Sequence, residues 1–155
     1  GRLMIKVASL FSQLLHHFPR TEFAHLVTKH GAEHRAKGFT CWTQLVAMLF
    51  CHLAHADSLR EICGGLACCQ GKLRHLGIGT APNKSTLSYA NKHRPASLYE
   101  DLFWTMLQRF RNSGRLGNRK RKFLSVGFLI WILPSFSQTA RYSYCHPEAG
   151  TGVGG

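Results

Sequence analysis

The sequence is poor in acidic residues, and this limits the chemistry that it can support. Only 7 of its 155 residues are Asp or Glu, against 20 Lys and Arg. A two-metal site for phosphoryl transfer needs several convergent carboxylates. Glu100 and Asp101 are adjacent and point in different directions on a helix, while Asp57 and Glu61 are placed to cap one. We therefore assign no catalytic residue and expect that the chain is not an enzyme by itself.

Other signatures of catalysis and metal binding are also missing. The sequence has neither a Gly-x-Ser-x-Gly motif nor a P-loop. It has six cysteines, but no Cys-x-x-Cys pair and no histidine pair at zinc-finger spacing. Cys51 and His55 lie one helical turn apart, which we interpret as a core thiol beside a surface histidine. We expect neither a metal nor another cofactor in this chain.

Long apolar runs and an export signal are absent too. No window reaches the roughly 18 apolar residues of a transmembrane helix, and the longest run, 123–136, contains Pro134. Residues 1–6 lack the apolar stretch and cleavage site of a signal peptide. These features predict a cytoplasmic protein with reduced thiols and no membrane contact.

What the chain has in excess is positive charge. Its formal net charge is +13 and its pI is about 10.1. Such a charge favours a polyanionic partner, either nucleic acid or an anionic membrane surface. Nucleic acid is the stronger expectation, and a basic protein without such a partner is the alternative.

Apolar residues recur at helical spacing from about residue 5 to residue 111. Helices are expected over 5–17, from about 20, over 40–56, from 58, over 86–93 and over 97–111. Thr40, Asp57 or Ser58, Asn83 or Ser85, and Ser97 are the expected N-caps, and Glu61 completes a capping box with Ser58. The assigned core residues are Trp42, Leu45, Leu49, Leu59, Leu102 and Phe103. The sequence predicts a mainly α small helical bundle over 5–111, followed by a basic linker and an irregular tail over 112–155.

The segment 57–93 has the outline of a helix-turn-helix. A capped helix leads through a glycine-containing connection, longer than the usual three or four residues, into a short basic helix. In a helix-turn-helix the second helix enters the major groove with its N-terminal residues toward base edges, and short polar and basic side chains suit such contacts. The candidate DNA-binding residues are Lys84, Ser85, Thr86, Tyr89, Lys92 and Arg94. A small basic helix packed on a bundle is the alternative.

Two further basic clusters are candidates for phosphate contacts. One contains Arg35 and Lys37, and the other contains Lys72 and Arg74. Attraction of such groups to phosphates weakens steeply with salt. Each cluster alone is also compatible with a solvated loop.

Several segments, taken in order, resemble the opening of bacterial insertion-sequence transposases with a DDE catalytic domain. They cover about residues 9–111 and read FSQLL (11–15), FPR (18–20), FTCWTQL (39–45), ADSLREI (56–62), HLGI (75–78) and KSTLSYAN (84–91). The resemblance implies that this helical region binds double-stranded DNA at the terminal inverted repeats of a mobile element. It further implies a bacterial, nucleoid-associated protein that takes part in DNA transposition and recombination, with self-association as a further expectation.

In the resembled family an RNase H-like domain with an acidic triad and two divalent metals, such as Mg²⁺, follows this region. Here the expected Leu-Asp-Ser-Thr motif is missing, and residues 128–135 read FLIWILPS. In the neighbouring reading frame, Trp131 followed by Ile132 must encode Asp, and the next two positions can encode Ser and Thr. We therefore expect a chain truncated or frameshifted before the catalytic domain, with an out-of-frame tail. The alternatives are a non-functional pseudogene remnant and a general basic nucleic-acid-binding protein.

Overall fold

A computed structural model describes residues 15, 16, 18–34, 36 and 38–112. The predicted helix over 5–17 and the predicted tail over 112–155 therefore lie almost entirely outside the described residues. Every regular element within the described part is helical. The prediction of a mainly α small bundle is confirmed there.

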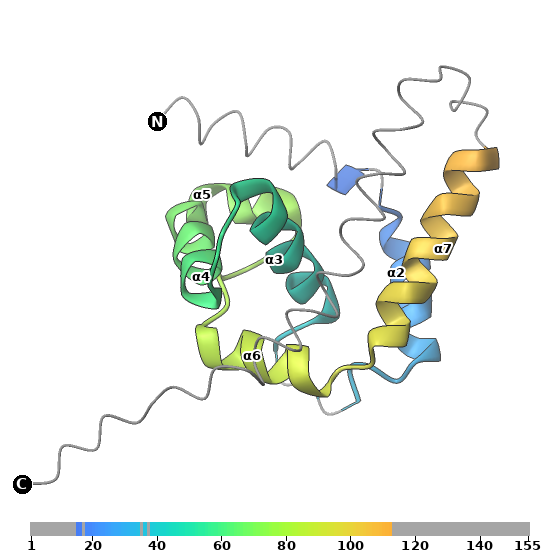
Figure 1. The fold of residues 1–155 in the computed structure, drawn as a ribbon, viewed down its shortest axis with the longest axis horizontal. Coiled ribbons are helices and arrows are strands. Elements are labelled where there is room, and N and C mark those ends of the chain that lie inside the picture. The colour runs from blue at the N-terminus through green and yellow to red at the C-terminus, as the bar shows by residue number, and fades with distance from the viewer. Residues whose placement is uncertain (1–14, 17, 35, 37, 113–155) are drawn as a thin grey trace, which may run out of the picture.

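The chain forms six α-helices and one 3-10 turn across these residues (Figure 1). They are α2 (Arg20–Lys29), α3 (Cys41–Ala54), α4 (Leu59–Cys68), α5 (Gln70–Leu73), η1 (Arg74–Leu76), α6 (Lys84–His93) and α7 (Ala96–Asn112). Helices α3 to α6 gather in one group, and α2 and α7 lie side by side at its edge (Figure 1). The glycine-containing connection before α6 is partly helical, since α5 and η1 together occupy all of 70–76.

Three of the predicted helix starts are confirmed by their hydrogen bonds. The hydroxyl of Thr40 accepts from the N–H of Thr43 at 3.1 Å, and the hydroxyl of Ser58 accepts from the N–H of Glu61 at 3.2 Å. The carboxamide oxygen of Asn83 accepts from the N–H of Thr86 at 2.8 Å. Each bond satisfies a donor that the first helical turn leaves without a backbone partner.

Two details of capping differ from the sequence prediction. The carboxylate of Glu61 reaches back to the N–H of Asp57 at 3.0 Å rather than to that of Ser58, so the reciprocal bond of the capping box is shifted by one residue. Ser97 is not an N-cap, because α7 begins at Ala96. The hydroxyl of Ser97 instead contacts Nδ1 of His30 at 3.1 Å, which joins the start of α7 to the end of α2.

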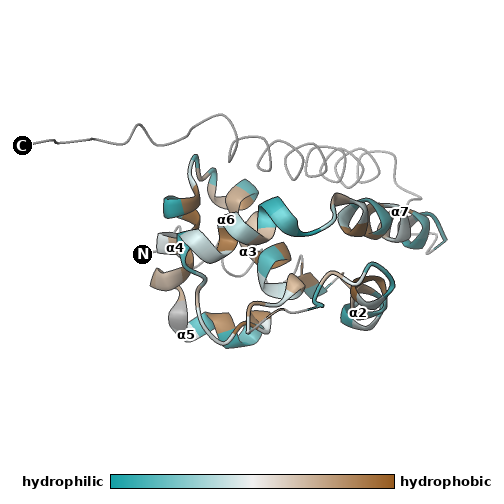
Figure 2. Cartoon of the chain, turned by 90° about the horizontal axis from the view of Figure 1, so that it is seen from below, coloured by the Kyte–Doolittle hydropathy of each residue, from teal (hydrophilic) through white to brown (hydrophobic). Residues whose placement is uncertain are grey.

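Helix α3 lies at the centre of the core. All residues from 41 to 50 are buried, and α4 and α6 are among the helices that pack against this part of α3. Figure 2 shows hydrophobic residues toward the middle of the group and hydrophilic residues on outward turns of α2 and α7. Of the predicted core residues, Trp42, Leu45, Leu49 and Leu102 are buried, whereas Leu59 and Phe103 are only half-buried.

Ion pairs at both ends hold α2 and α7 in an antiparallel pair. Arg109, near the end of α7, donates to Glu22 at 3.0 Å near the start of α2. Lys29, at the end of α2, donates to Asp101 at 2.8 Å near the start of α7. Opposite ends of the two helices therefore meet, so α2 and α7 run antiparallel.

Candidate nucleic-acid interface

Helix α6 is the predicted DNA-reading element, and its inner side fixes it to the bundle. Leu87 and Ala90 are buried, and the helix contacts both α3 and α4. The Asn83 cap sets the first helical residue at Lys84. On the other side of α6, the side chains of Lys84, Ser85, Tyr89, Lys92 and His93 are exposed.

One stripe of the outer side carries positive charge, and we call it the lysine row. It consists of Lys84, Ser88 and Lys92, spaced four residues apart and so aligned along one side of the helix. Both lysines are exposed and Ser88 is half-buried. Helix α6 contains no Asp or Glu that would neutralise this row internally.

A second stripe, the aromatic row, runs beside the first and consists of Ser85, Tyr89 and His93. All three side chains are exposed, and Tyr89 is 66% exposed, which is unusual for a large aromatic side chain. The rings of Tyr89 and His93 stack with centroids 3.9 Å apart. The stack holds two flat, polar-edged rings in fixed positions on the outer surface of the helix.

The hydrogen bonding of His93 determines which of its two ring nitrogens can contact a partner. Its Nδ1 lies 2.9 Å from the carbonyl oxygen of Tyr89. A carbonyl oxygen only accepts, so Nδ1 carries the hydrogen and Nε2 is the second polar atom of the ring. His93 was not among the predicted DNA-binding residues, although its spacing of four residues from Tyr89 is a signal that could have identified it.

Ser85 and Thr86 take part in the cap of the helix. The hydroxyl of Ser85 donates to the Asn83 carboxamide oxygen at 3.0 Å, and the N–H of Thr86 donates to the same oxygen. The Ser85 oxygen keeps its capacity to accept a hydrogen bond. Thr86 is half-buried and is therefore the less accessible of the two.

Arg94 differs from the other candidates, because its guanidinium turns into the protein. Its Nη1 donates to the carboxamide oxygen of Gln44 at 3.0 Å, its Nη2 donates to the carbonyl oxygen of Phe39, and it lies 5.1 Å from the centre of the Phe39 ring. Gln44 in turn donates to Asn91 at 2.7 Å. These contacts make Arg94 an anchor between α6 and the segment that leads into α3, and its predicted DNA contact stays a prediction.

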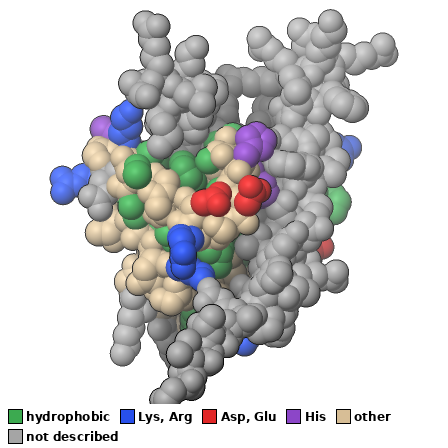
Figure 3. Space-filling model, turned by 60° about the vertical axis from the view of Figure 1, so that its left-hand side comes forward, with side chains coloured by type: hydrophobic (Ala, Val, Ile, Leu, Met, Phe, Trp, Pro, Cys, Tyr) green, Lys and Arg blue, Asp and Glu red, His purple; other side chains and the backbone are tan. Residues whose placement is uncertain are grey.

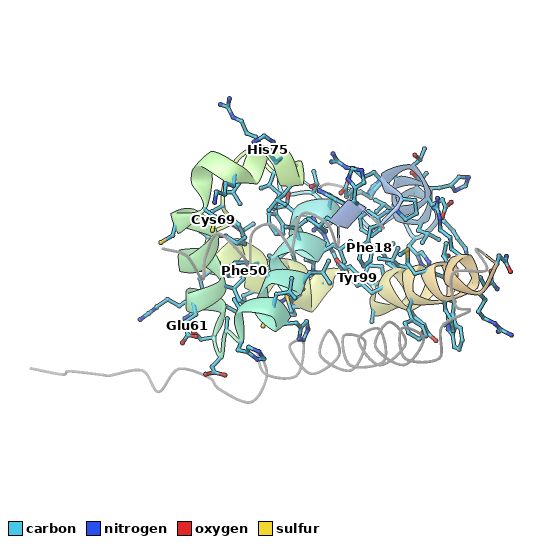
Figure 4. All side chains as sticks on the ribbon, turned by 90° about the horizontal axis from the view of Figure 1, so that it is seen from above. Phe18, Phe50, Glu61, Cys69, His75 and Tyr99 are labelled. Atoms are coloured by element: carbon cyan, nitrogen blue, oxygen red, sulfur yellow. The ribbon has the colours of Figure 1, made fainter. Side chains whose placement is uncertain are left out.

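The other predicted phosphate contacts are not brought together with α6. Lys72 on α5 and Arg74 on η1 are exposed, but these elements lie apart from α6 in both Figure 1 and Figure 2. Figure 4 shows His75, the neighbour of Arg74, at the outer edge of the group. Arg35 and Lys37 lie outside the described residues.

The face in Figure 3 carries Lys and Arg side chains as separate groups rather than as one continuous patch. Several carboxylates are engaged in contacts of their own. Glu22 and Asp101 pair with cations of the α2–α7 pair, Glu33 accepts from the N–H of Cys41, and Glu61 accepts from the N–H of Asp57. Among the predicted residues, Lys84, Ser85, Tyr89 and Lys92 are exposed together on one helix, α6.

Within the described residues, no helix is long and apolar enough to cross a membrane. The same part of the chain contains no cluster of three His, Cys, Asp or Glu side chains that could hold a metal ion.

Comparison with known proteins finds a match for one region of the chain. Residues 6–79 match the family profile of a domain of unknown function, DUF4372. The match covers slightly less than half of the chain, includes α2 to η1, and ends before α6. No curated protein and no solved structure matches the chain.

Proposed function

We propose that this protein binds double-stranded DNA through the outer face of α6, as the DNA-binding part of an insertion-sequence transposase. The observation that carries the proposal is the pair of parallel rows on α6, one with two lysines and one with a hydroxyl and two stacked rings. The net charge of +13 supports the proposal, since it attracts a polyanion over long range. The target implied by the sequence resemblance is the terminal inverted repeats of the element.

The dimensions of α6 suit the major groove of DNA. Ten helical residues span about 15 Å, and the groove is about 12 Å wide and accepts one α-helix. In the proposed complex Ser85, Tyr89 and His93 face base edges, while Lys84 and Lys92 bind phosphates on one side of the groove. Contacts to phosphates set the position of the helix, and contacts to base edges set the sequence preference.

The remaining basic residues have secondary roles in this proposal. Lys72 and Arg74 would bind phosphates away from those bound by α6, because α5 and η1 lie apart from it. Arg35 and Lys37 stay proposed phosphate contacts on the basis of their charge. The protein itself needs no metal for binding, and Mg²⁺ belongs to the catalytic domain of the resembled family.

Salt-dependent binding of the full chain tests the proposal. Fluorescence anisotropy would compare duplexes carrying the element ends with duplexes of scrambled sequence and equal composition. We expect a preference for the element ends that persists as salt rises. Equal binding that disappears with salt would indicate a general basic nucleic-acid-binding protein instead.

Substitutions on α6 locate the binding surface. Lys84→Ala and Lys92→Ala should each lower the salt slope of log K by about 0.9, the value for one lost phosphate contact. Tyr89→Ala should reduce the preference for element ends over scrambled DNA. Arg60→Ala, which removes an exposed charge on α4, is the matched control and should bind nearly as the wild type does. Wild-type binding by all α6 variants would refute α6 as the reading helix.

A further inference from the structure

Helix α7 uses one side to pack on the rest of the protein. Leu98, Tyr99, Leu102 and Met106 are buried on this side, and Figure 4 shows Tyr99 at the inner end of the helix. The ion pairs of Asp101 and Arg109 with α2 lie beside these residues. At about 100° per residue, the buried positions occupy about a third of the circumference of the helix.

The opposite side of α7 carries a stripe on which Glu100, Trp104 and Arg111 are exposed and Leu107 is half-buried, and we call it the outer stripe. It consists of Glu100, Trp104, Leu107 and Arg111, spaced by four, three and four residues, so that all four fall within about 60° of one another. Trp104 is 53% exposed, and the half-buried Phe103 packs against it edge to face with ring centroids 5.2 Å apart. This spacing is that of the seam between two packed helices.

The charges of the outer stripe are arranged at its two ends. Glu100 lies near the start of α7 and Arg111 near its end, both exposed. Neither makes an ion pair within the part of the chain that the structure describes, whereas the neighbouring Asp101 and Arg109 both pair with α2. The stripe therefore has a negative end, an apolar middle and a positive end.

We propose that two copies of this chain associate through the outer stripes of their α7 helices, which run antiparallel about a two-fold axis. In this arrangement Glu100 of one copy meets Arg111 of the second copy, and Trp104 meets Leu107 of the second copy. Glu100 and Arg111 are equally far from the midpoint of the stripe, and so are Trp104 and Leu107, as a two-fold axis requires. A parallel pairing would instead bring like charges together. This association is independent of the proposed DNA binding, which uses α6.

The size of the stripe sets the strength of the association. One pair of helices over three turns buries less than the roughly 1,200 Å² of a stable protein–protein interface. We therefore expect a reversible dimer with a dissociation constant in the range of about 10 to 500 μM. Each ion pair lies at the rim, where an exposed pair changes affinity by only about two- to fivefold.

Sedimentation velocity of the full chain without DNA tests this proposal over about 10 to 500 μM protein. Glu100→Arg and Arg111→Glu should each weaken association by about tenfold, because two attractive contacts become repulsive in the symmetric dimer. The double variant Glu100→Arg/Arg111→Glu exchanges the two charges and should restore wild-type association. Trp104→Ala should abolish association at all concentrations in this range.

Arg60→Glu is the matched control, since it changes an exposed charge on α4 by the same amount and should leave association unchanged. Circular dichroism should show equal helix content for all variants, because the substituted side chains are exposed. A concentration-independent monomer would overturn the proposal, as would a double variant that is no better than the single ones. A monomer whose Trp104 is protected from a fluorescence quencher would also overturn it and would show that the chain covers its own stripe.

Discussion

The side-chain amide of Gln44 donates a 2.7 Å hydrogen bond to the carboxamide oxygen of Asn91 and so joins the core helix α3 to α6. The carboxamide oxygen of the same Gln44 accepts a hydrogen bond from Arg94 at 3.0 Å. Both the nitrogen and the oxygen of this buried amide are therefore hydrogen-bonded. Asn91 completes the chain with a 3.5 Å contact from its nitrogen to the sulfur of Met48. This network explains how α6, with few apolar residues, is fixed against an apolar core.

Removal of Gln44 should destabilise the protein by more than the loss of one hydrogen bond. Gln44→Ala removes one hydrogen-bond partner from Asn91 and one from Arg94, which costs about 1–3 kcal/mol of unfolding free energy. Urea unfolding of Gln44→Ala, Asn91→Ala and the double variant measures the coupling, which should be at least about 0.5 kcal/mol. Gln108→Ala, at an exposed position, should change stability by less than about 0.5 kcal/mol. Strictly additive effects of the two substitutions would mean that the network is not coupled.

The adjacent glycines of α4 should respond in opposite directions to alanine. A Cβ at Gly65 would lie 2.7 Å from the ring of Phe50, whereas a Cβ at Gly64 meets nothing within 4 Å. Gly64→Ala should stabilise the protein by up to about 1 kcal/mol, because alanine favours the helix. Gly65→Ala should destabilise it by about 1–3 kcal/mol, because the ring must shift in a packed interior. Thermal unfolding of the two variants tests the contrast, and equal effects would contradict the α3–α4 packing.

The contact between α2 and α7 should weaken in acid. Hydrogen bonds from Lys29 and His30 hold the pKa of Asp101 below its ordinary value of 3.8. A lowered pKa in the folded state means that the carboxylate stabilises the protein above that ordinary value and that the effect is lost as pH falls through the folded-state pKa. The melting temperature of Asp101→Asn should therefore lie below that of the wild type at neutral pH. The gap should close below about pH 4, and a gap that is constant with pH would refute the assignment.

The cysteines should differ widely in reactivity. Burial raises the pKa of the Cys41 thiol to about 12, so little thiolate forms at neutral pH. Burial also raises the pKa of the Cys51 and Cys63 thiols, whereas Cys68 is exposed. Alkylation followed by peptide mass spectrometry should label Cys68 first and Cys41 only after unfolding. Labelling of Cys41 in the native protein at the rate of Cys68 would contradict its place in the core.

Much of the fold could be predicted from the sequence, because helix starts depend on contacts over three or four residues. Thr40, Ser58 and Asn83 each cap a helix, as expected from a side-chain oxygen three residues before the donor that it satisfies. Ser97 has the same local signal, but α7 begins one residue before it, and its hydroxyl contacts His30 instead. A local pattern does not reveal a partner 67 residues away.

The candidate site was predicted only in part, because the direction and the partners of a side chain depend on the folded structure. Helical spacing alone places Lys84, Tyr89 and Lys92 outside the buried positions of α6, and the structure confirms that these side chains are exposed. His93 was overlooked because its significance comes from the stack on Tyr89. Arg94 was assigned to DNA from its charge, which does not indicate the direction of its side chain.

The sequence by itself thus determined the starts of α3, α4 and α6, the apolar identity of α3 and the positive charge, since these depend on composition and short-range spacing. Only the tertiary structure decided that Arg94 turns inward to Gln44, and that α5 and η1 lie apart from α6. It also decided that Gly65 lies against Phe50, and that Asp101 pairs with α2 while Glu100 does not. These relationships join residues far apart in the chain, and their positions follow from how the helices pack rather than from any local preference.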